Sequence, residues 1–206
     1  MCLQELKSTV EKVPASLCEL QGYRCYWHGE RAYSGVGLHI RRDAFADEPH
    51  FVHPAFDYET RIVTARLADL VVASVYVPNG GKDFPAKMKF LGEMERYVGE
   101  THASGARVII CGDINITRTE RDVHPKERNP ALVGQRPEER EIFERILAQG
   151  LVDLLSRNLD GAGDLRSVNG ATVLAAAHAE GGGVGMSRKG AGWRGGSAPG
   201  FTCSAA

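Results

Sequence analysis

Apolar residues follow strand spacing in several segments of the chain. Residues 70–77 (LVVASVYV) form a nearly continuous apolar run, typical of a strand covered on both faces, and the turn sequence PNGG closes it. Residues 61–67 (RIVTARL) alternate between polar and apolar side chains, which predicts a half-buried strand. Further strands are predicted at residues 1–5, 34–40 and 107–111.

Two other segments have helical spacing. Residues 85–100 begin with a proline, and one face of this segment collects the apolar residues Met88, Leu91, Met94 and Val98. Residues 137–149 also begin with a proline, carry acids in the first turn and end before Gly150. Residues 113–136 are predicted to be a long polar loop. Because strands and helices mix along the chain, the fold class is predicted to be α/β or α+β.

The pattern changes near residue 160. Half of the 24 glycines lie in residues 161–206, where only Asp164 and Glu180 are acidic. Such a composition supplies little core, and regular spacing is absent apart from a short Ala-rich stretch at residues 171–179. We therefore predict one domain over residues 1–158 and a Gly/Ala-rich, disordered tail over residues 159–206.

Length, net charge and cysteine content limit the classes of function that this chain can have. A length of 206 residues suits a single domain, and a formal net charge of -1 means that any nucleic-acid surface must be local. The chain shows no apolar run that could span a membrane and no secretory leader, so we predict no membrane partner. Its five cysteines form no C-x-x-C pair, which argues against a disulfide framework and predicts a reducing, cytoplasmic setting.

Asp113 and Asn115 follow directly after the strand predicted at residues 107–111. If the backbone stays extended, their side chains point the same way at the carboxyl end of a strand, where α/β sheets place ligands. Asp113 could then activate a water molecule for phosphodiester hydrolysis, and Asn115 could hold that water or a phosphate oxygen. The alternative interpretation is a turn in which both side chains cap backbone N–H groups.

Two further strand ends carry candidate residues. Glu5 ends a short apolar strand and could bind Mg²⁺, which prefers oxygen ligands; the alternative is an exposed strand-end acid. Tyr76 precedes the PNGG turn and could hydrogen-bond a phosphate; the alternative is a core tyrosine. The seven histidines lack H-x-x-x-H spacing, so no zinc site is predicted, and His28 is predicted to be a packing residue.

Basic residues in the predicted loops could flank these strand ends. Such side chains bind phosphate backbones, although solvated surface charge is the alternative for each of them. We predict contacts with DNA from five basic residues and one amide: Arg61, Asn79, Lys82, Lys87, Arg118 and Lys126.

Together, these segments resemble the exonuclease III family of AP endonucleases, within the endonuclease/exonuclease/phosphatase superfamily. The resemblance covers residues 2–158 and follows the family's order through CLQELK (2–7), YSGVGLHIRR (33–42), ETRIVTARL (59–67), VYVPNGG (75–81), FPAKMKFL (84–91), ICGDINI (110–116), DVHPKERN (122–129) and RPEEREIFERILAQGLVD (136–153). Ordered matches are more specific than any single motif. They favour the functional interpretation of Glu5, Tyr76, Asp113 and Asn115.

The resemblance implies a four-layer α/β sandwich of two packed sheets. It also implies cleavage 5′ to abasic sites and 3′-to-5′ exonuclease action on duplex DNA, with Mg²⁺ or Mn²⁺. By position, Glu5 matches the metal-binding glutamate, and Tyr76 matches the tyrosine near the scissile phosphate. Asp113 matches the acid/base aspartate and Asn115 its companion amide, and both are expected to contribute to the metal site.

The resemblance is incomplete at both ends. The family has an N-x-N-G-type motif before LQE, and W-R-I-D-Y-like and S-D-H motifs after GLVD, and none of the three is present here. We therefore predict an incomplete sandwich, truncated at both ends, with weak or no hydrolysis. The alternatives are a non-catalytic DNA-binding fragment and a superfamily phosphodiesterase that acts on lipid or inositol phosphates.

Overall fold

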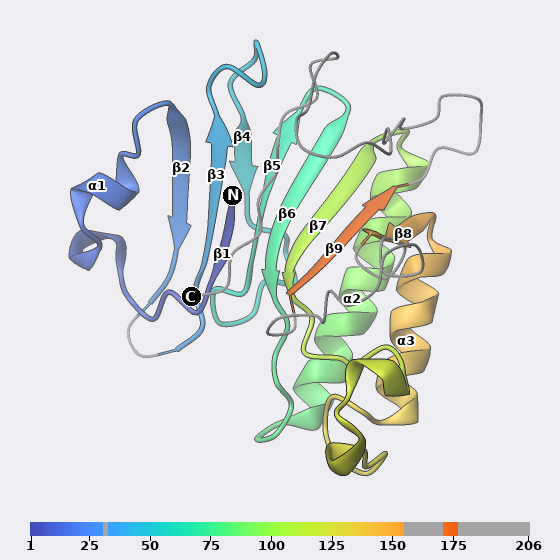
Figure 1. Ribbon diagram of the computed structural model, residues 1–206. Coiled ribbons are helices and arrows are strands. Elements are labelled where there is room, and N and C mark those ends of the chain that lie inside the picture. Colours follow the sequence, from blue (N-terminus) through green and yellow to red (C-terminus); the bar gives the residue numbers. More distant parts are fainter. Residues whose placement is uncertain (31–32, 155–170, 177–206) are drawn as a thin grey trace, which may run out of the picture.

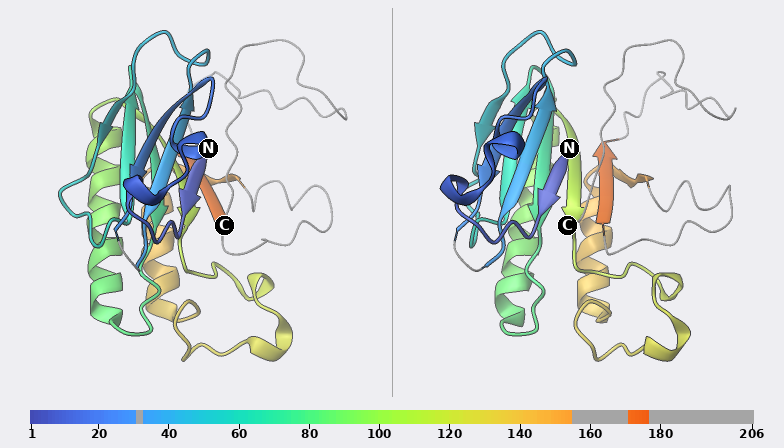
Figure 2. Two further views of the ribbon diagram at one scale, coloured as in Figure 1. Left: turned by 90° about the vertical axis from the view of Figure 1, so that its left-hand side faces the viewer. Right: turned by 60° about the vertical axis from the view of Figure 1, so that its left-hand side comes forward.

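The computed structural model describes residues 1–30, 33–154 and 171–176. Two β-sheets pack face to face, and two long helices cover the outer face of the larger sheet (Figures 1 and 2). This arrangement confirms the predicted α/β fold with two packed sheets. Within the described part of the chain, no helix is both long enough and apolar enough to cross a membrane.

The small sheet has three antiparallel strands in the order β1-β3-β2, with bounds β1 Cys2–Gln4, β2 Tyr23–His28 and β3 Val36–Arg41. The central strand β3 pairs Gly37 with Leu3 on one side and with Trp27 on the other. Two short helices, η1 (Val10–Lys12) and α1 (Ala15–Cys18), lie between β1 and β2 in the chain. Because β1 has only three residues, the backbone leaves the sheet at Glu5.

The large sheet has the order β4-β5-β6-β7-β9-β8, with bounds β4 His50–Val52, β5 Ile62–Leu67, β6 Leu70–Tyr76, β7 Arg107–Asp113, β8 Leu151–Asp153 and β9 Ala171–Ala176. Its neighbouring strands are antiparallel except β6 and β7, which are parallel and connected through helix α2 (Phe84–Ala103). Helix α3 (Pro137–Ala148) packs beside α2. The loop before α3 contains η2 (Glu120–Asp122) and η3 (Pro125–Glu127).

Two apolar layers hold these elements together. Strand β6 supplies both layers, because Val75 belongs to the core under the helices, whereas Val72 belongs to the core between the sheets. The predicted apolar face of α2 is buried, and Leu91 and Met94 have no exposed surface. Burying a side chain of this size stabilises the fold by about 1.5–3 kcal/mol. The alternation along β6 explains why the sequence there is apolar throughout.

Strand β9 lies within residues 159–206, the range predicted to be a disordered tail. Its backbone pairs with β7 on one side and with β8 on the other, so residues 171–176 extend the large sheet, and the tail over the rest of that range stays a prediction. The pairing partners of β9 lie far away along the sequence, and strand preference depends on such partners more than on local composition. The other residues of the predicted tail lie outside the described residues.

Candidate functional site

A glycine brings the ends of β6 and β7 together. A Cβ atom at Gly112 would lie 1.8 Å from the carbonyl oxygen of Val75, and φ at this position is +151°, which favours glycine. The backbones can therefore approach closely, and the parallel register places Tyr76 beside Asp113. The glycine of the ICGDINI segment thus has a structural reason, since it sets the position of the aspartate that follows.

Asp113 and Asn115 are held by a tight turn rather than by a continuing strand. Asn115 has a left-handed φ of +52°, its backbone N–H donates to Asp113 Oδ1 at 2.9 Å, and its Nδ2 donates to Val77 O at 2.8 Å. The expectation of an extended backbone through Asn115 is therefore wrong. The turn uses one carboxylate oxygen of Asp113, as the capping interpretation expected. It also brings Asn115 next to Asn79, whose Nδ2 lies 3.4 Å from Asn115 Oδ1.

Glu5 reaches the same place from the small sheet. It follows β1 with a left-handed φ of +56°. Its Oε1 accepts a hydrogen bond from the Tyr76 hydroxyl at 3.3 Å, and its Oε2 accepts one from Lys7 Nζ at 2.5 Å. The structure therefore brings Glu5 and Tyr76 together from the two sheets, with Asp113 beside Tyr76 in the register of β6 and β7.

The two carboxyl groups differ in their electrostatic environment. Burial raises the pKa of Asp113, and the nearby charge of Glu5 raises it further. The pKa of Glu5 is lowered, chiefly by its hydrogen bond from Lys7. Burial also raises the pKa of Tyr76, so its hydroxyl stays protonated and can donate. Asp113 is thus biased toward accepting a proton, whereas Glu5 stays ionised.

The donor atoms around this turn are oxygens. They come from the carboxylates of Glu5 and Asp113 and from the amides of Asn79 and Asn115. Hard divalent cations such as Mg²⁺ and Mn²⁺ prefer this donor type. A bound cation would also offset the repulsion between the two carboxylates that raises the pKa of Asp113. The residues present therefore fit a hard divalent cation.

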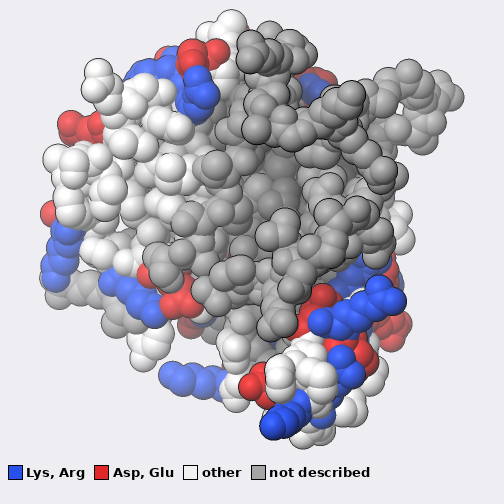
Figure 3. All heavy atoms as spheres, viewed as in Figure 1, with Lys and Arg blue, Asp and Glu red and all other residues white. Residues whose placement is uncertain are grey.

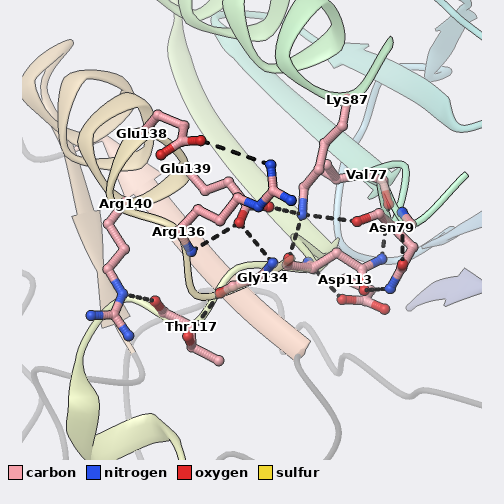
Figure 4. Close-up of polar contacts among 12 residues, drawn as sticks. Val77, Asn79, Lys87, Asp113, Thr117, Gly134, Arg136, Glu138, Glu139 and Arg140 are labelled. Atoms are coloured by element: carbon pink, nitrogen blue, oxygen red, sulfur yellow. Dashed lines mark hydrogen bonds and ion pairs between the residues drawn. The ribbon is translucent and has the colours of Figure 1, made fainter. Parts of the chain in front are cut away.

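A buried ion pair supports the turn that carries Asp113 and Asn115. Lys87 of α2 and Glu139 of α3 are both fully buried, with Nζ and Oε1 2.5 Å apart (Figure 4). Lys87 Nζ also donates to the backbone oxygens of Asn115 at 2.7 Å and Asn79 at 3.1 Å. Burial lowers the pKa of Lys87, and the Glu139 carboxylate opposes this shift. Lys87 therefore fixes the backbone of both site asparagines.

The role of this ion pair differs from the prediction for Lys87. A side chain without exposed surface cannot contact a DNA backbone, so the predicted DNA contact is corrected to an internal one. Glu139 was not predicted to have a role; its Oε2 accepts from the backbone N–H groups of Gly134 and Arg136 at 2.7 and 3.1 Å. One signal was available: Lys87 lies four residues before Leu91, on the face of α2 that the apolar spacing marks as buried.

Three of the candidates for DNA contact lie around an open pocket beside the turn: Asn79 and Lys82 are exposed, whereas the Arg61 side chain is 12% exposed and pairs with Glu59 at 2.9 Å. Arg61, Asn79 and Lys82 all line this pocket. The Arg61 guanidinium lies 4.9 Å above the Tyr76 ring, and Lys82 Nζ lies 5.5 Å from the centre of the exposed Tyr33 ring. Arg61 therefore lies next to Tyr76 and Asn79 next to Asn115, and Lys82 lines the same pocket.

Arg118 and Lys126 belong to the long loop before α3. Arg118 is engaged with Glu144 at 2.6 Å and lies 3.7 Å from Asp153, so part of its charge is neutralised within the chain. Lys126 lies in η3 and is exposed. On the face drawn in Figure 3, the Lys and Arg side chains of the described residues are interspersed with Asp and Glu. Positive potential at this loop is therefore local.

Comparison with known proteins identifies the family. The model of the endonuclease/exonuclease/phosphatase family matches residues 1–202. The chain belongs to this family. This confirms the resemblance drawn from the sequence motifs, and the matched range also includes most of the residues that were predicted to form a tail.

Curated relatives of this family member carry DNA repair names. Exodeoxyribonuclease III of Haemophilus influenzae is 29% identical over 166 residues, which cover 73% of this chain and 62% of the relative. Recombination repair protein 1 of Drosophila melanogaster is 30% identical over 74% of this chain and 23% of its own length. DNA repair nuclease APEX1 of Danio rerio is 28% identical over 74% of this chain and 51% of its own length. The chain thus spans less than two thirds of each of these relatives.

Solved structures share the fold. The 3'-5' exonuclease NExo from Neisseria meningitidis superposes with a TM-score of 0.70 and 26% identity, covering 85% of this chain and 75% of the exonuclease. An AP endonuclease from Archaeoglobus fulgidus also has a TM-score of 0.70 over the same shares, at 23% identity, and supports the fold alone. The two-sheet arrangement that positions Glu5 and Asp113 is therefore the arrangement of known nucleases.

Proposed function

We propose that this chain is a DNA repair nuclease of exonuclease III type. It would hydrolyse phosphodiester bonds at abasic sites and act as a 3′-to-5′ exonuclease on duplex DNA, with Mg²⁺ or Mn²⁺. The observation that carries this proposal is the meeting of Glu5 from the small sheet with Tyr76 and Asp113 from the large sheet. Family membership and the DNA repair names of the relatives support it.

Each residue of the site has a role that its environment suits. Glu5 would hold the divalent cation together with the oxygens of Asp113 and Asn115. When bound, the cation would supply Lewis-acid stabilisation of the charge on the phosphate. Asp113, whose pKa is raised by burial, would accept a proton from the attacking water. Tyr76, whose phenol stays protonated, would donate a hydrogen bond to the phosphate or to the leaving oxygen.

The surrounding loops would bind the DNA backbone. Arg61, Asn79 and Lys82 line the pocket beside Tyr76, and exposed Lys126 adds a positive charge on the loop before α3. Contacts of this kind position the duplex without reading its sequence. The protein would act in the cytoplasm, where thiols stay reduced; the described cysteines Cys2, Cys18, Cys25 and Cys111 form no disulfide, which agrees with this setting.

A cleavage assay on a synthetic duplex with one abasic site tests this function. We expect slow, Mg²⁺-dependent incision 5′ to the abasic site. The sequence contains no S-D-H motif, and the loss of one transition-state donor costs about 10²–10³ in rate. Asp113→Asn should abolish the incision, whereas Asp47→Asn, at an exposed position away from the site, should leave it unchanged.

The duplex assay, run beside an assay on an inositol phosphate, separates the competing functions. Binding of the duplex without incision, at any Mg²⁺ or Mn²⁺ concentration, would indicate a non-catalytic DNA-binding protein. Mg²⁺-dependent hydrolysis of an inositol phosphate but not of DNA would indicate a phosphodiesterase of another class. Either result would overturn the nuclease proposal.

A further inference from the structure

Two histidines and an aspartate lie together in a part of the molecule that the proposed hydrolysis does not use. His28 ends β2 of the small sheet, His53 follows β4 of the large sheet, and Asp57 precedes β5. One potential ligand atom from each residue lies within 4.8 Å of the other two. His53 and Asp57 are four residues apart, but His28 lies on a strand of the other sheet, which is why histidine spacing alone predicted no metal site here.

The carboxylate of Asp57 is already oriented for a ligand. Its Oδ1 accepts hydrogen bonds from the backbone N–H groups of Arg61 at 2.9 Å and Ile62 at 3.1 Å. Its Oδ2 lies 2.5 Å from Nε2 of His28, and the side chains of Asp57 and His28 are each only 15% exposed. Carboxylates that bind metals are commonly held by such outer hydrogen bonds, which fix the direction of the remaining oxygen.

The two imidazoles are held beside this carboxylate by aromatic packing. The rings of His28 and His53 are stacked with their centres 3.7 Å apart. Tyr26 packs edge-on against His53 at 5.4 Å and stacks on Phe51 at 4.9 Å. Both rings therefore lie within reach of the Asp57 carboxylate.

An ion pair between His28 and Asp57 does not account for His53. A cation that binds Nε2 of His28, one nitrogen of His53 and Oδ2 of Asp57 would use all three side chains, and it would replace the hydrogen bond between His28 and Asp57. It also joins β2 of the small sheet to the segment between β4 and β5 of the large sheet.

We propose that His28, His53 and Asp57 form a Zn²⁺ site that links the two sheets. Two nitrogen ligands and one carboxylate oxygen suit this borderline ion better than Mg²⁺, which prefers oxygen ligands alone. Three protein ligands leave a fourth position for water. This inference does not depend on the proposed nuclease activity, because none of the three residues belongs to the site around Asp113.

Titration of the full-length, chelator-treated chain with Zn²⁺ tests the site. We expect saturable binding that raises the Tm. His53→Ala should weaken this binding by more than about tenfold. The His53 side chain is exposed, so the variant should keep the fold. His50→Ala is the matched control, since His50 is an exposed histidine of neighbouring β4 and should bind Zn²⁺ as the unaltered chain does.

Two further measurements keep the proposal falsifiable. Asp57→Asn retains an oxygen that can accept from Arg61 and Ile62 but removes the charge, so it should weaken Zn²⁺ binding while the fold survives. Co²⁺ should give a visible spectrum of a four-coordinate site without the strong near-ultraviolet band of a thiolate ligand, which excludes binding by cysteine. Zn²⁺ binding that is unchanged in His53→Ala and Asp57→Asn, or the thiolate band, would overturn the proposal.

Discussion

The two carboxylates of the candidate site are delivered by very different parts of the molecule. Asp113 ends β7, a seven-residue strand in the middle of the large sheet, and its turn rests on the buried pair of Lys87 and Glu139. Glu5 follows β1, a three-residue strand at the edge of the small sheet, and its side chain is 39% exposed. The Asp113 carboxylate is thus fixed by the core, whereas the Glu5 carboxylate is held by contacts near the surface.

This difference has a chemical consequence. A group that handles protons needs a fixed position and a shifted pKa, and burial in the large sheet provides both for Asp113. A metal ligand that must admit and release a hydrated cation gains from access to solvent, which the position of Glu5 provides. The large sheet thus supplies the rigid side of the site, which carries Asp113. The small sheet supplies the adjustable side, which carries Glu5.

The largest expected effect comes from breaking the buried pair of Lys87 and Glu139, which supports the turn at Asp113 on the rigid side. Lys87→Met leaves Glu139 buried and unpaired, which should lower the free energy of unfolding by about 3–5 kcal/mol in urea denaturation. Lys89→Met, two residues away on the exposed face of α2, should change it by less than about 0.5 kcal/mol. The double variant Lys87→Met/Glu139→Leu should recover much of the loss. A small effect of Lys87→Met would show that the turn at Asp113 does not depend on the pair.

Acid should lower the free energy of unfolding through His39 of the small sheet, on the adjustable side. His39 lies on β3 next to β1, is 2% exposed, and its ring nitrogens have no hydrogen-bond partner among the described residues. Burial lowers its pKa from 6.5 to about 4. Between these values the unfolded chain binds a proton that the folded chain does not. Stability should therefore fall by about 3 kcal/mol as the pH drops from 6.5 to 4.

Urea unfolding across this pH window measures the effect. His39→Leu should remove most of the pH dependence, because the remaining side chain does not titrate. His50→Gln should keep it, since His50 is exposed on β4. An equally steep loss of stability in His39→Leu would place the acid sensitivity elsewhere in the molecule.

The smallest expected effect is a difference in sign between the two carboxylates. Asp113→Asn removes a carboxylate whose pKa is raised by burial, so it should increase the free energy of unfolding by about 1 kcal/mol. Glu5→Gln removes a carboxylate stabilised by Lys7 at the surface, so it should decrease that free energy by less than about 1 kcal/mol. Thermal unfolding of both variants at neutral pH checks the comparison, which fails if the two changes have the same sign.

Much of the rigid side could be predicted from the sequence. The apolar runs at residues 70–77 and 107–111 mark buried strands, and Asp113 and Tyr76 stand at their ends. The ordered motifs indicated that Glu5 joins them. The backbone at Asn115 could not be predicted, because its left-handed turn depends on contacts with Val77 and Asn79 from another strand end.

Contacts between distant segments account for the other differences. Lys87 is part of a lysine-rich segment and looks like a surface cation until Glu139 of α3 is placed against it. His53 and Asp57 are four residues apart, but the cluster is complete only with His28, which comes from β2 of the other sheet. Strand β9 is defined by its pairing with β7 and β8 rather than by its own pattern. In each case the deciding partner lies far away along the chain.

The affinity for Mn²⁺ tests most directly whether Glu5 and Asp113 form one site. Electron paramagnetic resonance titrations would compare the unaltered chain with Glu5→Gln, Asp113→Asn and the double variant. If both carboxylates hold the same cation, each single change weakens binding by about tenfold or more, and the double change weakens it by less than the product of the two. Affinity that is unchanged by either substitution, or effects that multiply independently, would contradict a shared metal site.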